Sequence, residues 1–270
     1  MTVDYDDLLG FAVAQAEQAG DIIRYYFDRT DKDIELKADH TQVTAADLQI
    51  NQQVIDAVKK AYPDHGVLAE EGSYEEHRTN LWVCDPIDGT DGFITGIPTA
   101  VFALAFVEDG VPKIAVIYDP FLRSVTTAII GKGARCNGVV IRVSGHSIAM
   151  AKIMALTSYR AMLEAESFYR ALMAKGAVVK LASGNMFKTA LIARGNADAY
   201  IFPGSGAHDV AATKLIVEEA GGRVTDLYGN EQRYDQPIAG AIISNGHIHA
   251  DLVQALTDFG PQNYLKPAAP

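Results

Sequence analysis

The chain has 270 residues, of which 49% are hydrophobic and 21% are charged. This composition is too apolar for a disordered chain, and the length suffices for one large domain or two closely packed halves. The formal net charge of -11 argues against nucleic acid or an anionic membrane as the main partner. It does not exclude a phosphorylated substrate, because a bound metal ion changes the local sign of the charge.

The first part of the chain is predicted to form two helices followed by a sheet. Apolar residues at helical spacing predict helices over Tyr5–Phe27 and Ala45–Ala61. Thr44 and Asp47 resemble a capping box at the start of the second helix. Strand-like runs follow at Val67–Ala69, Leu81–Cys84, Ala100–Val107, Ile114–Tyr118 and Val125–Ile130. Short turns join the last three runs, which predicts an antiparallel meander.

The second part of the chain alternates between strand-like and helical patterns. Strands are expected at Ile153–Leu156, Val178–Leu181, Ala199–Phe202, Arg223–Thr225 and Ala241–Ser244. Helices are expected at Met162–Ala174, Met186–Arg194, Val210–Ala220 and Ile248–Phe259. This alternation predicts an α/β layer. Polar residues at 143–150 predict a boundary between an α+β N-terminal half, 1–145, and an α/β C-terminal half, 146–270.

The two cysteines, Cys84 and Cys136, are too few for a disulfide framework or a zinc ribbon. We interpret both as reduced core residues. The N-terminal segment is acidic and lacks the basic start of a signal peptide. The longest apolar stretch, near Thr99–Val107, is too short to span a bilayer. We therefore expect a soluble, cytoplasmic protein without a membrane partner.

The most informative stretch is Asp85-Pro-Ile-Asp-Gly-Thr90, which follows a strand-like apolar run. Pro86 lacks an amide proton and Gly89 permits unusual backbone angles, so this segment cannot continue as a regular ladder. It can aim two carboxylates, of Asp85 and Asp88, and one hydroxyl at the same point. Two carboxylates held that close need a cation, or one of them keeps its proton. Hard divalent cations such as Mg²⁺ take oxygen ligands of this kind.

Three further acidic positions fit a metal site but each has a plainer interpretation. Glu70 and Glu71 follow a short strand and precede a glycine, as a solvated turn does. Asp209 stands at the predicted start of a helix, where Asp is a good N-cap. Asp47 occupies the first turn of its helix. None of these positions predicts a metal site by itself.

Taken together, these segments resemble the inositol monophosphatase superfamily. The resemblance covers about residues 5–258. It rests on Glu70-Glu71, on Asp85-Pro-Ile-Asp-Gly-Thr90, on Asp209-Val-Ala-Ala and on Glu218-Glu-Ala-Gly-Gly222. It implies a layered αβαβα sandwich of the sugar-phosphatase type, and Mg²⁺-dependent, lithium-sensitive hydrolysis of phosphate monoesters. It also implies a homodimer.

The resemblance assigns roles to individual residues. The metal ligands are expected to be Glu70, Asp85, the Ile87 carbonyl, Asp88 and Asp209, around two or three Mg²⁺ ions. Thr90, supported by Asp47, is expected to orient the attacking water. The amides of Gly89 and Thr90 are expected to contact the phosphate, as turn amides and helix N-termini do. Paired metal ions about 3.5–4 Å apart stabilise charge on the attacking and leaving oxygens, which suits this chemistry.

Substrate contacts are expected at Gly89, Thr90, Asp91, Ser183, Gly184, Asn185, Phe202 and His208. Several of these positions depart from the family pattern. His208 stands where the family usually has Trp, and Asp91 where relatives have Thr or Lys. Phe202 stands where inositol-selective members place a Glu that holds a ring hydroxyl.

We expect the substrate to be a small polyol or sugar phosphate, and the departures leave alternatives within the superfamily. The run Thr90-Asp-Gly-Phe-Ile-Thr-Gly96 is similar to members acting on histidinol phosphate. Its Gly-Phe pair is also similar to the 3′(2′),5′-bisphosphate nucleotidase branch.

Hypotheses from other classes stay open. Gly204-Ser-Gly-Ala-His-Asp209, with Asp226 further on, partly mimics a dinucleotide fingerprint, but Asp209 would repel a pyrophosphate. Asp85 could be the nucleophile of an aspartyl-phosphate enzyme, although those enzymes place their second Asp two residues on. A third hypothesis is a non-catalytic relative that binds another protein.

Overall fold

The computed structural model describes residues 4–29, 32, 34–36, 42–155 and 165–264. The described helices are α1 (Tyr5–Phe27), α2 (Ala45–Ala61), α3 (Thr90–Thr95), α5 (Glu166–Ala174), α6 (Asn185–Ala193), α7 (Ala211–Glu219), α8 (His249–Phe259) and α9 (Pro261–Tyr264). A 3₁₀ turn spans Ile148–Met150. Within these described ranges, no helix is both long and apolar enough to cross a bilayer.

The larger sheet has seven strands in chain order among the described residues. They are β3 (Gly66–Ala69), β4 (Asn80–Asp88), β5 (Val101–Glu108), β6 (Val111–Asp119), β7 (Ser124–Ile129), β8 (Gly133–Cys136) and β9 (Val139–Val140). Only the β3–β4 pair is parallel among these neighbours, and the others are antiparallel. The predicted meander is therefore confirmed over β5, β6 and β7.

The smaller sheet lies in the second half of the chain and has the strand order β11-β10-β12-β14-β13. Its strands are β10 (Lys152–Ala155), β11 (Val178–Leu181), β12 (Ala199–Phe202), β13 (Arg223–Thr225) and β14 (Ala241–Ser244). β10 pairs in parallel with β11 and β12, whereas β14 is antiparallel to β12 and β13. The sheet is mixed, as expected when strands alternate with helices.

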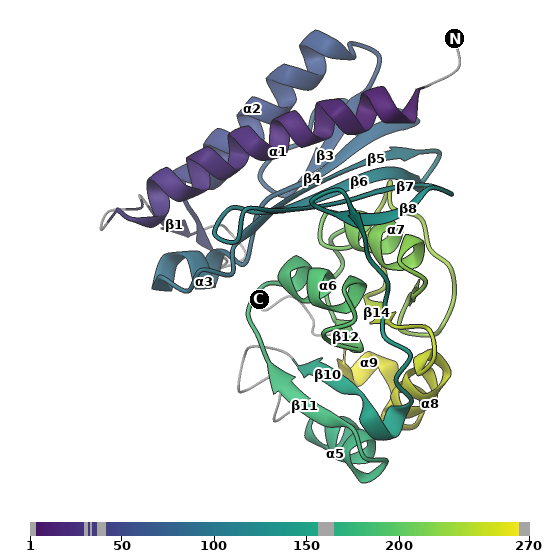
Figure 1. Ribbon diagram of the computed structural model, residues 1–270. Helices are drawn as coiled ribbons and strands as arrows, with labels where there is room; N and C mark the ends of the chain where they lie inside the picture. The colour runs from purple at the N-terminus through teal and green to yellow at the C-terminus, as the bar shows by residue number, and fades with distance from the viewer. Residues whose placement is uncertain (1–3, 30–31, 33, 37–41, 156–164, 265–270) are drawn as a thin grey trace.

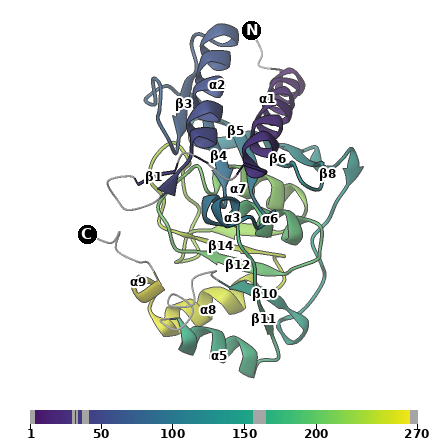
Figure 2. The same cartoon turned by 90° about the vertical axis from the view of Figure 1, so that its left-hand side faces the viewer.

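The elements stack in five layers (Figure 1). Helices α1 and α2 cover the outer face of the larger sheet, and α6 and α7 pack between the two sheets. Helices α5 and α8 cover the outer face of the smaller sheet, as the rotated view also shows (Figure 2). The predicted αβαβα layering is confirmed. We keep the division into 1–145 and 146–270 as a proposal.

Each interface between layers has its own apolar core. One core joins α1 and α2 to the larger sheet, around the buried side chains of Trp82 and Phe102. The second lies between the sheets and draws residues from both halves of the chain, such as Leu81 and Ile216. The third lies beneath the smaller sheet, around Phe168. Because the middle core is shared, the two halves pack as one body at the level of the site.

Local sequence explains the boundaries of the first two helices. The Asp4 carboxylate accepts a hydrogen bond from the Asp6 amide at the start of α1. The predicted capping box of α2 is present, with the Asp47 carboxylate 2.8 Å from the Thr44 amide. Both helices have the predicted bounds. The amphipathic spacing of each helix places its apolar stripe against the larger sheet.

Several short elements differ from the predictions. The chain forms helix α3 directly after Gly89, and it forms a small two-stranded sheet from β1 (Glu35–Leu36) and β2 (Gln42–Val43). The start of the predicted helix Met162–Ala174 lies outside the described residues. Both cysteines are free, but Cys136 is half-buried, so only Cys84 is a core residue. Elements as short as α3, β1 and β2 contain too few residues to show a periodic pattern in the sequence.

A buried histidine predicts how stability depends on pH. His249 at the start of α8 is 7% exposed and forms hydrogen bonds with the hydroxyls of Thr225 and Ser244. Burial, followed by the nearby charges of Arg223 and Lys214, lowers the pKa of His249 to about 4. The folded state therefore binds fewer protons than the unfolded state below pH 6.5. This contribution to stability is complete above pH 6.5 and is lost as the pH falls toward 4.

We expect the free energy of unfolding to fall by about 2 kcal/mol between pH 7.5 and pH 5 because of this one residue. Urea titrations of the wild type and of His249→Gln at both pH values measure the effect. The variant should show a smaller pH dependence than the wild type. The exposed His247 provides a control for the substitution itself, since His247→Gln makes the same chemical change outside the core. An equal change in the free energy of unfolding between pH 7.5 and pH 5 for the wild type and for His249→Gln would contradict the role of His249.

Candidate active site

A bulge in β4 brings two aspartates to the same side of the strand. Asp85 pairs with Ala103 and Asp88 pairs with Val101, so two residues on β4 oppose one on β5. In a regular strand, residues three apart point to opposite faces. The extra residue in the bulge cancels that alternation. The expected break in the ladder is thus confirmed as a bulge, and the strand itself continues past Cys84 to Asp88.

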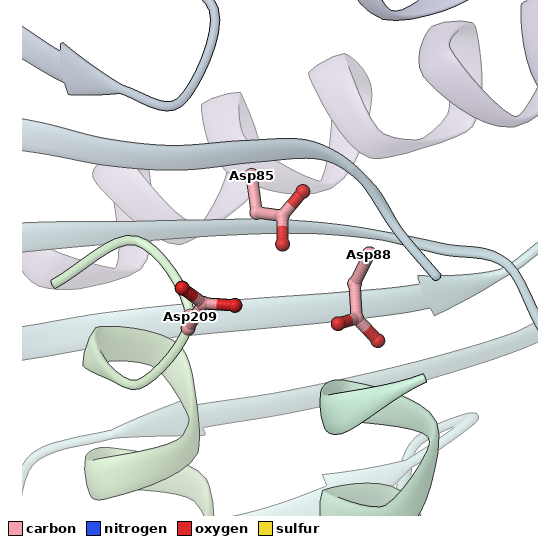
Figure 3. Close-up of side chains that lie close together, drawn as sticks. All are labelled: Asp85, Asp88 and Asp209. Carbon is pink, nitrogen blue, oxygen red and sulfur yellow. The ribbon is translucent and has the colours of Figure 1, made fainter. Parts of the chain in front are cut away.

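A third aspartate reaches this pair from the C-terminal half. Asp209 lies in the loop just before α7, whose N-cap is Val210. One carboxylate oxygen from each of Asp85, Asp88 and Asp209 lies within 4.8 Å of the others. Figure 3 shows the three carboxylates converging on a shared space between β4 and the start of α7. Asp209 is therefore not the N-cap of the helix.

The N-terminus of α6 binds one of these carboxylates. The Asp88 oxygens accept hydrogen bonds from the amides of Asn185, at 2.9 Å, and Met186, at 2.8 Å. This approach requires a glycine at position 184, where φ is +77° and a Cβ would lie 3.0 Å from Asp88 Oδ2. An aspartate of the first half thus caps a helix of the second half, where the helix dipole stabilises its charge.

The three carboxylates are crowded and mostly buried. Asp85 is 1% exposed and Asp88 is 4% exposed. Burial raises the pKa of Asp85 well above its usual range, and the charges of Glu70, Asp88 and Asp209 raise it further. Burial also raises the pKa of Asp88, although the amides of Met186 and Asn185 and the charge of Lys188 oppose the shift. Such a cluster is unfavourable by itself and favourable around a cation.

The donor set fits a hard divalent cation. Asp85 Oδ1 is buried and has no hydrogen-bond partner among the residues that the structure describes. A buried carboxylate oxygen without a partner costs free energy unless something else binds it. The neighbouring candidate ligands are also carboxylate oxygens, the type that Mg²⁺ and similar ions prefer.

The other predicted metal and catalytic residues are linked to the cluster by charge or by chain position, and Glu70 is not among the three carboxylates that converge. The charges of Glu70 and Asp47 both raise the pKa of Asp85, which places them within electrostatic range of it. The Thr90 hydroxyl donates a hydrogen bond to the Ile87 carbonyl, at 3.1 Å. The Asp47 carboxylate accepts hydrogen bonds from the amide and hydroxyl of Thr44.

The predicted substrate residues divide into those at the cluster and those away from it. Asn185 Nδ2 donates to Asp209 Oδ1 at 3.0 Å, and His208 Nε2 lies 3.3 Å from Asp209 Oδ2. Ser183 lies beside α3, since a Cβ on Gly92 would be 3.2 Å from its hydroxyl. Asp91 is exposed in the first turn of α3. Phe202 is 6% exposed and belongs to the core between the sheets.

Two hollows in the surface are lined by predicted site residues, His208 in one and Glu70 in the other, although neither is lined by Asp85, Asp88 or Asp209. One, of ≈ 470 Å³, is bounded by the end of β3, the residues before Asp209 and the segment 235–237. The other, of ≈ 680 Å³, lies over Glu70 and Glu71. Their acidic lining residues are Glu70, Glu71, Glu75, Glu76 and Asp235, and neither contains Lys or Arg among the described lining residues.

Lys188 and Tyr200 also lie beside the cluster, although neither is among the predicted site residues. Lys188 is 1% exposed and its Nζ lies 3.9 Å from the centroid of the Tyr200 ring. The Tyr200 hydroxyl donates to Asn185 Oδ1 at 2.5 Å. A lysine within the otherwise largely apolar stretch 186–193 was the one signal in the sequence. Tyr200 carries no comparable signal, because a tyrosine in a buried strand is ordinary.

Comparisons with known proteins agree with this geometry. A model of the inositol monophosphatase family matches residues 4–259. A Thermotoga maritima relative named fructose-1,6-bisphosphatase/inositol-1-monophosphatase is 30% identical over 253 residues, covering 93% of this chain and 96% of the relative. The histidinol-phosphatase of Mycobacterium tuberculosis is 30% identical over 263 residues, covering 94% and 99%.

A solved structure extends the likeness to three dimensions. The Thermotoga maritima IMPase structure matches with a TM-score of 0.85 and 30% identity, covering 95% of this chain and 99% of that one. The family match spans the bulge, Asp209 and the layered fold described above. The chain therefore belongs to the inositol monophosphatase family and is a phosphoric monoester hydrolase.

Proposed function

We propose that this protein hydrolyses the phosphate monoester of a small polyol or sugar in a Mg²⁺-dependent reaction. The observation that carries the proposal is the convergence of Asp85, Asp88 and Asp209, with one buried oxygen of Asp85 left without a partner. This arrangement occurs within the fold of a phosphatase family.

The proposed metal ligands are Glu70, Asp85, the Ile87 carbonyl, Asp88 and Asp209. When bound, divalent ions supply Lewis-acid stabilisation of phosphate oxygens and make a bound water more acidic. The chain contributes a rigid frame, because Asp88 is fixed by α6 and Asp209 by Asn185. One carboxylate from each half, Asp88 and Asp209, is therefore held in place at the boundary between the halves.

Thr90 and Asp47 are the proposed catalytic residues. In this proposal Thr90 orients the attacking water, and Asp47 supports Thr90. The phosphate is proposed to contact the amides of Gly89 and Thr90, since the first amides of a helix have no acceptor within that helix. Gly89 has a φ of +92°, a conformation that favours glycine and starts α3 directly after β4.

The charges around the site favour a monophosphate over a bisphosphate. The described linings of the two hollows offer acidic side chains and no Lys or Arg for a second phosphate. Repulsion from Glu76 and Asp235 would disfavour one. We therefore place a 3′(2′),5′-bisphosphate nucleotide behind the two monophosphate classes, which are a polyol or sugar phosphate and histidinol phosphate. The relative named histidinol-phosphatase supports keeping histidinol phosphate as an alternative substrate.

A panel of phosphate esters tests the proposed function. Phosphate release should be measured from inositol 1-phosphate, histidinol phosphate, fructose 1,6-bisphosphate and adenosine 3′,5′-bisphosphate. We expect release from a monophosphate with Mg²⁺, loss of release with EDTA, recovery when Mg²⁺ is restored, and inhibition by lithium. Metal-independent release would contradict the proposed mechanism, and a preference for a bisphosphate would contradict the proposed substrate class.

The remaining expectations concern the state of the protein in the cell. A homodimer and a cytoplasmic location stay predictions. Light scattering on the purified protein measures the first, and fractionation of the source cells measures the second.

A further inference from the structure

The acidic cluster has a buried cation on the side formed by α6. Lys188 lies three residues after Asn185, so the two side chains occupy the same face of that helix. Asn185 binds Asp88 through its amide and Asp209 through its side chain. The charge of Lys188 acts on Asp88 in turn. One helix face therefore presents a cation and two hydrogen-bond donors to the cluster.

The position of the ammonium group is fixed by an aromatic ring. Lys188 Nζ lies 3.9 Å from the centroid of Tyr200, and both residues are at most 2% exposed. A cation–π contact is strongest when it is shielded from water, as here. Burial lowers the pKa of Lys188 to about 8, while the charge of Asp88 raises it. The ring face and the Asp88 carboxylate both favour the charged form of Lys188.

The same ring continues into a chain of hydrogen bonds. The Tyr200 hydroxyl donates to Asn185 Oδ1, and Asn185 Nδ2 donates to Asp209 Oδ1. The side-chain amide of Asn185 is thereby held in one orientation, with its NH₂ group toward Asp209. The two residues thus act on two members of the cluster: Lys188 acts on Asp88 through its charge, and Tyr200 acts on Asp209 through Asn185.

We propose that Lys188 and Tyr200 are positioning residues of the metal centre, which assemble the three aspartates before a cation binds. The buried ammonium offsets part of the repulsion that Asp88 meets in the cluster, and the bond chain from Tyr200 orients Asp209. This role rests on the proposed function, because it assumes that the cluster is a metal site. Neither residue is required to contact the substrate.

The first test removes the charge and measures stability with and without metal. In EDTA, Lys188→Met should lower Tm by roughly 5 °C, because the carboxylates lose their counter-charge. Saturating Mg²⁺ should close most of the gap to the wild type, since the added cation replaces the missing charge. Lys214→Met is the matched control, because it removes a shielded ammonium that binds Glu218 and Glu231. The difference in Tm between Lys214→Met and the wild type should be the same in EDTA and in saturating Mg²⁺.

A difference in Tm between Lys188→Met and the wild type that is equal with and without Mg²⁺ would show a packing role only and overturn the proposal.

The second test applies even if Lys188→Met does not fold. Tyr200→Phe keeps the ring under the ammonium and removes only the hydroxyl. Calorimetric titration should show Mg²⁺ binding about tenfold weaker than in the wild type, as for other partners of metal ligands.

Tyr118→Phe is the control for this variant, since the Tyr118 hydroxyl accepts from Arg24 on the opposite side of the larger sheet. Mg²⁺ affinity of Tyr200→Phe equal to that of Tyr118→Phe would overturn the role of the bond chain. These measurements use no substrate. A protein that releases no phosphate but shows both metal effects would therefore remove the proposed function and leave this role of Lys188 and Tyr200 in place.

Discussion

Replacing Asp85 by Asn should abolish Mg²⁺-dependent phosphate release while making the metal-free protein more stable. Mutating hydrogen-bond partners of metal ligands costs about 10–100-fold, so losing a ligand itself should cost on the order of 10³-fold or more. The gain in stability follows from the raised pKa of Asp85, which means that its charged form is unfavourable in the folded state. An amide at this position carries no charge and relieves the repulsion.

Two measurements separate these effects. Phosphate release with Mg²⁺ reports the loss of activity, and thermal unfolding in EDTA reports the gain in stability. Asp119→Asn is a matched control, because Asp119 is buried but accepts hydrogen bonds from the amides of Phe121 and Leu122. Asp119 lies outside the cluster. Its variant should therefore keep the Mg²⁺-dependent phosphate release of the wild type. Substantial Mg²⁺-dependent activity in Asp85→Asn would contradict the assignment of Asp85 as a ligand.

Replacing Thr90 by Ala should lower the rate on the order of 10²–10⁴-fold, the range for a residue that positions a proton transfer. The hydroxyl of Thr90 sits one turn from the bulge and donates to the Ile87 carbonyl. Because that carbonyl is a proposed metal ligand, Mg²⁺ should bind about tenfold more weakly to Thr90→Ala, and kcat at saturating Mg²⁺ should still fall by the larger factor. Steady-state kinetics and calorimetry on the same protein preparation measure the two quantities.

Thr90→Ser is the control, since it keeps the hydroxyl and removes only a methyl group. It should retain most of the activity. A loss smaller than about tenfold in Thr90→Ala would mean that the bound metal activates the water without help from Thr90. In that case Asp47 would also lose its proposed catalytic role, because it acts through Thr90.

The fold was predictable where long segments repeat one pattern. α1 and α2 have the predicted bounds, because each combines an apolar stripe with a capping side chain at its start. Strands β11, β12, β13 and β14 also have the predicted bounds, since each is a short strand-like run between turn residues. The sequence does not reveal α3, because its six residues follow directly on Gly89, which is typical of a turn. Pairing between distant strands carries no local signal.

The candidate site was predictable from residue type but not from geometry. Asp85, Asp88 and Asp209 gather as the resemblance implied. The bulge that aligns the first two was visible only as a conflict between Pro86 and the strand pattern. The capping of α6 by Asp88 joins residues 97 positions apart. Contacts of this kind, like that of Lys188 with Tyr200, depend on how the two sheets pack, which no local pattern specifies.

The most direct test of the account is a crystal structure with Mn²⁺ in place of Mg²⁺, analysed by anomalous scattering. The account predicts an anomalous peak from a Mn²⁺ ion that is coordinated by carboxylate oxygens of Asp85, Asp88 and Asp209. Clear density for these three side chains with no peak among them, in crystals of protein that releases phosphate, would contradict it.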